Sequence, residues 1–123
     1  MNPIQVFNSY ANMSVPGYYT SLCVAVVAHE LGHVFACRVL GLKIIQIGIN
    51  WRGPFVKRER STPGNNLLVS LYGPITNLFL VWMTIGIMPQ FAFVNLAVGV
   101  LNLLPIPTSD GRNIIRAIKE IVN

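Results

Sequence analysis

Three long apolar stretches constrain the fold of this chain more than any other feature. They run from Gly17 to Leu42, from Leu67 to Met88 and from Phe91 to Leu104. A helix needs about 20 residues to cross a hydrocarbon core of about 30 Å, so the first two stretches can each span a bilayer, while the third is short. With 53% hydrophobic and 11% charged residues, the 123-residue chain departs from a soluble globular composition. We therefore predict a mainly α membrane protein with three transmembrane helices in one membrane-embedded domain.

Basic residues are distributed unevenly along the chain. All nine Lys and Arg residues lie at Arg38 or later, in the connection after the first stretch and in the tail. Positive charge stays on the cytosolic side, so we expect a multi-pass protein of a prokaryotic plasma membrane with its N-terminus outside and its C-terminus in the cytosol. The net charge of +5 indicates contact with anionic lipid and not with nucleic acid, because no basic residue is interleaved with a stacking platform. The N-terminal MNPIQVFNSYANMSVP lacks the pattern of a cleavable signal peptide.

The first apolar stretch contains HELGH, residues 29 to 33. On a helix, His29 and His33 differ by about 40° in azimuth and about 6 Å in height, so their imidazoles converge on one point, as zinc binding requires. Glu30 lies at the flank, where a carboxylate can act as general base toward an attacking water. The alternative is a pair of buried histidines with satisfied hydrogen bonds. Because ionisable groups are costly in lipid, a functional site is the better interpretation.

A catalytic zinc site needs three protein ligands and one open position. The acids after the motif are Glu59, Asp110 and Glu120. Glu59 and Glu120 lie among charged residues and are expected to be solvated. Asp110 follows two prolines that must end the third helix near Leu104. This helix stops about 9 Å before the cytosolic face, so irregular chain brings Asp110 to nearly the depth of the histidines. Asp110 as N-cap of a tail helix is the alternative.

The two cysteines are expected to be free thiols. Cys23 and Cys37 lie on one predicted helix, with backbones about 21 Å apart, well beyond disulfide reach. Cys37 shares a helix face with the two histidines, but a small buried hydrophobe is the plainer interpretation.

Three motifs together resemble the site-2 protease family of intramembrane metalloproteases. HELGH, GPITN (residues 73–77) and NLLPIPTSDG (residues 102–111) match its core motifs in order, within a resemblance that covers residues 20 to 115. The resemblance implies Zn²⁺ bound by His29, His33 and Asp110, with Glu30 as catalytic base. It also implies cleavage of a transmembrane protein or peptide substrate within the lipid bilayer. Many members carry further spans or a soluble regulatory domain, so a homo-oligomer or a regulatory membrane partner could complete the functional unit.

Two amides belong to the supporting motifs. Asn77 and Asn102 lie in apolar surroundings, where an unpaired amide is costly. The resemblance implies that one or both donate to the scissile carbonyl or its oxyanion. Hydrogen bonding between helices explains them equally well, and we assign Asn95, which belongs to no motif, to that structural role. Gly73 and Pro74 are expected to interrupt the second span.

Residues 44–58 predict a β-hairpin on the cytosolic side. Ile, Ile, Ile and Trp at positions 45, 47, 49 and 51 alternate with Gln, Gly, Asn and Arg at positions 46, 48, 50 and 52. A turn at residues 52–54 then leads to a return strand at 55–58. Its open edge could receive an unwound substrate by β-augmentation, although interfacial anchoring by Trp51 and Phe55 is the plainer role. Residues 112–122 predict an amphipathic helix along the cytosolic membrane surface.

These features predict an intramembrane zinc endopeptidase that hydrolyses a peptide bond in or near a transmembrane segment. The alternative is a non-catalytic zinc-bound membrane protein that binds a client helix. Glu30 argues against it, because a structural zinc site fills all four positions with protein ligands. A soluble zinc protease is excluded because the second and third stretches lack a polar face.

Overall fold

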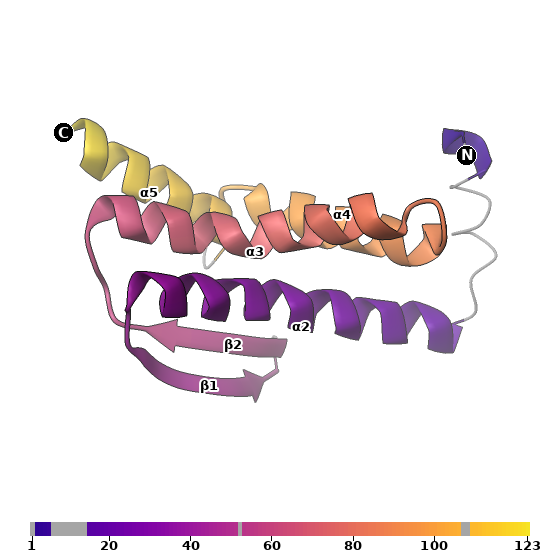
Figure 1. The fold of residues 1–123 in the computed structure, drawn as a ribbon, viewed down its shortest axis with the longest axis horizontal. Coiled ribbons are helices and arrows are strands. Elements are labelled where there is room, and N and C mark those ends of the chain that lie inside the picture. Colours follow the sequence, from indigo (N-terminus) through magenta and orange to yellow (C-terminus); the bar gives the residue numbers. More distant parts are fainter. Residues whose placement is uncertain (1, 6–14, 52, 107–108) are drawn as a thin grey trace.

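The computed structural model describes residues 2–5, 15–51, 53–106 and 109–123 (Figure 1). The main elements in chain order are α2 (Val15–Leu40), β1 (Ile44–Asn50), β2 (Gly53–Arg58), α3 (Pro63–Thr84), α4 (Pro89–Leu103) and α5 (Asp110–Val122). The predicted mainly helical fold with one hairpin and a C-terminal helix is confirmed.

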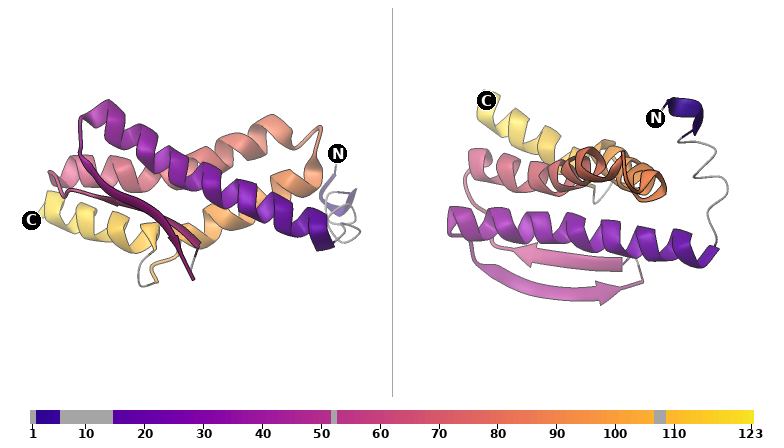
Figure 2. Two further views of the ribbon diagram at one scale, coloured as in Figure 1. Left: turned by 90° about the horizontal axis from the view of Figure 1, so that it is seen from below. Right: turned by 45° about the vertical axis from the view of Figure 1, so that its right-hand side comes forward.

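Helix α3 lies at the centre of the molecule. It packs against α2, α4 and α5, while α2 also contacts α4 and β2. The hairpin therefore covers one side of α2, and the other three helices lie on its opposite side (Figures 1 and 2). This arrangement brings the middle of α2 close to the beginning of α5, although 69 residues separate the end of α2 from Asp110 along the chain.

The boundaries of α3 differ from the prediction by one helical turn at each end. The helix begins at Pro63, where the Thr62 hydroxyl caps it by accepting the Asn65 N–H at 3.3 Å. A capping threonine before a first-turn proline is a common helix start, but hydropathy begins to rise only at Leu67. The expected interruption at Gly73 and Pro74 is wrong, because α3 continues through Pro74 to Thr84.

Within the described residues, two helices are long and apolar enough to cross a membrane. These segments are Gly17–Leu40 in α2, with 24 residues, and Pro63–Thr84 in α3, with 22 residues. Helix α4 has 15 residues and ends at Leu103, which confirms the predicted stop near Leu104. At about 1.5 Å per residue it covers less than a hydrocarbon core. A third complete span therefore remains a prediction.

The hairpin is antiparallel, with Ile47 opposite Val56 and Gly48 opposite Phe55. The two predicted strands are confirmed, and the side chains at positions 45, 47, 49 and 51 are all exposed, but exposure does not alternate along β1, because Gln46 and Asn50 are exposed as well. Phe55 does not share that exposed face. It is partly buried, and its ring covers Gly48, where an added Cβ would lie 2.9 Å from the ring. Arg52, in the predicted turn, lies outside the described residues.

Small apolar side chains make the contacts between the helices. One buried cluster joins Ala25 of α2 to Val94 and Val98 of α4. A second joins Ala36 and Cys37 of α2 to Val69 of α3. Close approach of helices through small residues is typical of membrane proteins. Both cysteines are free, as predicted, and Cys37 packs in this second cluster.

Candidate metal centre

His29, His33 and Asp110 come together at the junction of α2, α3 and α5. One ligand atom from each of these residues lies within 4.8 Å of the other two. Asp110 Oδ2 is 2.6 Å from His29 Nε2 and 3.2 Å from His33 Nε2. The two Nε2 atoms are 3.2 Å apart. The structure thus joins the two helical histidines to the acid that the sequence favoured as third ligand.

Both histidines are oriented by hydrogen bonds from the other ring nitrogen. His29 Nδ1 donates to Asn77 Oδ1 at 2.7 Å, and His33 Nδ1 donates to the Val69 carbonyl at 2.7 Å. In a neutral imidazole, donation from Nδ1 leaves a lone pair on Nε2. Metal-binding histidines are commonly held in this way. Both lone pairs consequently face the carboxylate of Asp110.

The donor set fits a tetrahedral zinc ion. Ligands at about 2.0 to 2.1 Å from zinc lie about 3.3 Å from one another. Two of the three observed separations are 3.2 Å. Two lone pairs and a carboxylate facing each other at these distances repel unless a cation or a proton lies between them. Burial raises the pKa of Asp110, but its contacts with the two imidazoles outweigh this and lower it, so the carboxylate is ionised and can bind a cation.

Gly73 leaves room beside these atoms. A Cβ added there would lie 2.7 Å from His29 Nε2 and 2.6 Å from His33 Cε1, closer than side chains approach one another. Any other residue at this position would place its Cβ in the space between the ligands. The glycine of GPITN therefore has a direct steric role at the site.

Asp110 is directed toward the histidines by the first turn of α5. The N-cap of this helix is Ser109, whose hydroxyl accepts the Arg112 N–H at 3.2 Å. The same hydroxyl lies 2.6 Å from the Leu104 carbonyl and can donate to it. Asp110 as N-cap is therefore wrong. Capping by the preceding serine leaves both oxygens of Asp110 free to face the imidazoles.

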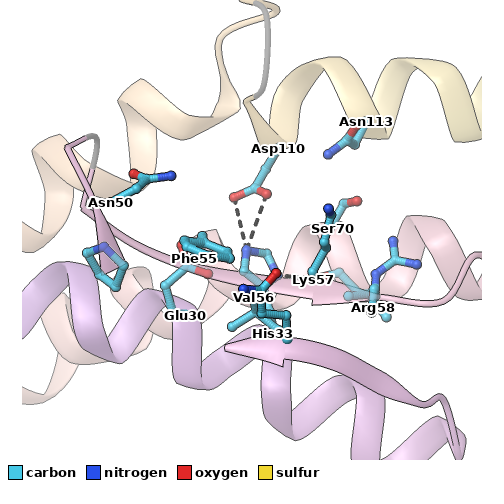
Figure 3. Close-up of a pocket in the computed structure, with 13 residues that line it drawn as sticks. Glu30, His33, Asn50, Phe55, Val56, Lys57, Arg58, Ser70, Asp110 and Asn113 are labelled. Carbon is cyan, nitrogen blue, oxygen red and sulfur yellow. Dashed lines mark hydrogen bonds and ion pairs between the residues drawn. The ribbon is translucent and has the colours of Figure 1, made fainter. Parts of the chain in front are cut away.

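A cavity of about 630 Å³ opens beside two of the three residues, His33 and Asp110 (Figure 3). Glu30 lines it together with His33 and Asp110, as required of a base that acts on a substrate at the metal. On the opposite side, five consecutive residues of β2, from Pro54 to Arg58, also line it. Gln46 and Asn50 of β1 line it as well, so the cavity extends along β2 and over part of one face of the hairpin.

The other acids of the sequence lie apart from this site. Glu59 is exposed and accepts the Lys43 N–H at 2.8 Å. Glu120 is 3.7 Å from Arg60 in an exposed ion pair. Both have the solvated positions that the sequence predicted.

The two predicted substrate amides have different surroundings. Asn77 is fully buried and uses its amide group on His29, the Ala25 carbonyl and Asn95. Asn102 donates to the Val98 carbonyl of its own helix at 2.8 Å. For Asn77 these contacts are the interhelical hydrogen bonds left open as the alternative. A role for either amide toward substrate stays a prediction.

Other residues near the site were not singled out from sequence. Gln46 and Asn50 line the cavity from β1, and Asn113 lines it from α5. The alternation of residues 44–51 placed Gln46 and Asn50 on one face, and this signal could have identified them. Asn95 accepts a hydrogen bond from Asn77 of α3 at 3.0 Å, which confirms the interhelical role predicted for it.

Comparison with known proteins gives relatives in sequence and in fold. No family model matches the chain. A zinc metalloprotease of Methanocaldococcus jannaschii is 30% identical, with 79% of this chain and 32% of that protein covered. A protein of Synechocystis named as a zinc metalloprotease is also 30% identical, with 79% of this chain and 30% of that protein covered. The chain thus spans about a third of the length of these relatives.

The same fold is present in a solved structure, the site-2 protease from Methanocaldococcus jannaschii. The TM-score is 0.74 at 24% identity, with 94% of this chain and 61% of that chain covered. The match therefore includes nearly all of the helices and the hairpin described above. Taken together, this chain has the fold of that site-2 protease, and the sequence relatives that it matches are named as zinc metalloproteases.

Proposed function

We propose that this protein is an intramembrane zinc endopeptidase that hydrolyses a peptide bond in or near a transmembrane segment of its substrate. The observation that carries the proposal is the convergence of His29, His33 and Asp110 next to a cavity that His33, Asp110 and Glu30 line. The names of its relatives and the apolar character of α2 and α3 support it. The membrane location, with the basic segments on the cytosolic side, is part of the proposal.

The residues at the site have separate roles in the proposed reaction. His29, His33 and Asp110 would hold Zn²⁺, which would supply Lewis-acid chemistry for the scissile carbonyl and the attacking water. Glu30 accepts a proton from this water during attack and returns it to the leaving amine. The hydrogen bonds from the Nδ1 atoms to Asn77 and Val69 keep both imidazoles oriented throughout. Each group thus has one task in peptide hydrolysis.

The edge of β2 suits an extended substrate. Because β2 lines the cavity and, in the two-stranded sheet of the described residues, pairs with β1 along one edge, a substrate segment unwound from a helix can add to its other edge as a further strand. Main-chain hydrogen bonds to β2 would then hold the scissile bond between the hairpin and the metal ligands. Of the two roles considered for the hairpin, this one matches the position of Phe55 in the cavity lining, while Trp51 remains exposed and available for anchoring.

The substitution Glu30→Gln tests the proposed reaction. It keeps size and hydrogen bonding but removes the base, so turnover should fall by about 10²- to 10⁴-fold. The variant should bind zinc like the parent. The measurement is cleavage of a labelled transmembrane substrate in liposomes, with zinc content determined in parallel. Parental turnover in Glu30→Gln would exclude the mechanism. A parent protein that binds zinc and substrate without cutting would instead support the non-catalytic alternative.

A further inference from the structure

A hydrogen-bond chain connects α4 to the metal centre through α3. Asn77 and Asn95 are among the largest fully buried side chains of the described residues, each with 0% exposure. Asn95 Nδ2 donates to the Phe91 carbonyl at 3.0 Å, and Asn77 Nδ2 donates to Asn95 Oδ1 at 3.0 Å. Asn77 Oδ1 in turn accepts from His29 Nδ1 at 2.7 Å. The chain therefore begins in the backbone of α4 and ends at a metal ligand.

The direction of every bond in this chain follows from its ends. The Phe91 carbonyl can only accept, so Asn95 must turn its NH₂ group toward Phe91 and its oxygen toward Asn77. The NH₂ group of Asn77 is then used by Asn95 Oδ1 and by the Ala25 carbonyl, 3.0 Å away. The remaining oxygen of Asn77 faces His29 and requires a proton on Nδ1. His29 is thereby held in the tautomer whose Nε2 can bind a metal.

We propose that Asn95 is a positioning residue of the metal centre, which acts through Asn77 to keep the proton of His29 on Nδ1. The proposal rests on the proposed function in so far as the site binds zinc. Asn95 lies outside the three motifs. In this proposal its amide sets the direction of the hydrogen bonds that lead to His29, in addition to joining two helices. Helix α4 does not depend on Asn95 alone for its contacts, because it also packs on α2 through the apolar cluster of Ala25, Val94 and Val98 and contacts α3.

Two substitutions of Asn95 distinguish the loss of its hydrogen bonds from a loss of helix packing. Asn95→Leu removes the oxygen that accepts from Asn77, so the Asn77 amide loses one of the two contacts that set its direction. Asn95→Asp keeps an acceptor oxygen and, protonated in this apolar site, an O–H for the Phe91 carbonyl. Val98→Ala is the packing control, because it trims the cluster and leaves every hydrogen bond of the chain in place. If Asn95→Leu fails to fold, Asn95→Ala removes the same oxygen without a branched side chain.

The experiment measures zinc affinity by competition with a chelator, on the full chain in detergent micelles. Partners that orient metal ligands contribute about 10- to 100-fold to affinity. We expect a loss of this size in Asn95→Leu, near-parental affinity in Asn95→Asp, and parental affinity in Val98→Ala despite a lower unfolding temperature. Parental affinity in Asn95→Leu, or equal losses in all three variants, would overturn the proposal.

The tautomer of His29 can be observed without zinc or proteolysis. In metal-free protein at alkaline pH, ¹⁵N chemical shifts report which ring nitrogen carries the proton. The parent and Asn95→Asp should show Nδ1–H at His29, and Asn95→Leu should show a mixture of tautomers. The same tautomer in all three proteins would overturn the role of Asn95. If instead the tautomer shifts as expected and the parent binds no zinc, the proposed function fails while the positioning role stands.

Discussion

At the scale of single residues, the spacing of the histidines in the sequence is enough to predict the candidate metal site. His29 and His33 share a helix face because four residues make about one turn, so their convergence depends on local geometry alone. The favoured position of Asp110 depended on two prolines and on membrane thickness. The role of Gly73 could not be predicted in the same way, because it arises where α3 passes the histidines of α2 and concerns the absence of a side chain.

Gly73→Ala is expected to disturb the ligands directly. The added methyl group would meet His29 Nε2 and His33 Cε1, so zinc affinity should fall by about 10- to 100-fold, as for other losses of ligand support. Gly64→Ala is the matched control, because the same change in the same helix meets nothing within 4 Å. Zinc affinity measured by chelator competition distinguishes the two. Equal affinities would show that Gly73 does not limit the space at the site.

At the scale of elements, hydropathy predicted the helices better than their ends. The first turn of α3 is polar, with Asn65 and Asn66, so it was assigned to the preceding connection although Thr62 and Pro63 mark a helix start. The hairpin was predictable because its alternation is strict from Ile45 to Trp51. Its position beside the metal centre was not, since this depends on the contact of β2 with α2.

Ser109→Ala tests how the start of α5 presents Asp110. Loss of the cap should lower the free energy of unfolding by about 0.5 to 2 kcal/mol, and zinc affinity should fall because Asp110 is the next residue. Thr62→Ala removes the corresponding cap of α3 and should have a similar effect on stability with parental zinc affinity. Unfolding and zinc titration of both variants provide the comparison. Equal zinc affinities in the two variants would separate the Ser109 cap from the site.

At the scale of the whole molecule, charge predicts an orientation in the membrane. The N-terminal stretch before α2 has no basic residue, and the hairpin carries several. A cysteine introduced near Asn8 should therefore react with a membrane-impermeant reagent only from outside, and one near Lys57 only from the cytosolic side. Replacement of Cys23 and Cys37 provides the background. The reverse labelling pattern would contradict the three-span arrangement, in which α4 crosses only part of the bilayer.

The fold also limits the role that a partner protein could have at the site. It spans about a third of the length of its sequence relatives, while the proposed metal ligands, the proposed base and the strand beside them all lie within the described residues. A homo-oligomer or a regulatory membrane partner, which the sequence suggested, remains a proposal. Such a partner would act on access of substrate to the cavity, because the ligand set is formed within one chain.

Residues from α2 and α5 are proposed to form one zinc site, and the zinc content of the purified protein and its variants tests this. Purified parent protein and Glu59→Ala should each contain about one zinc per chain, since Glu59 is exposed and its carboxylate accepts the Lys43 N–H away from the site. Asp110→Ala should lose the metal, because it leaves two histidines where a catalytic zinc site needs three protein ligands. Equal zinc content in Asp110→Ala and Glu59→Ala would contradict the account.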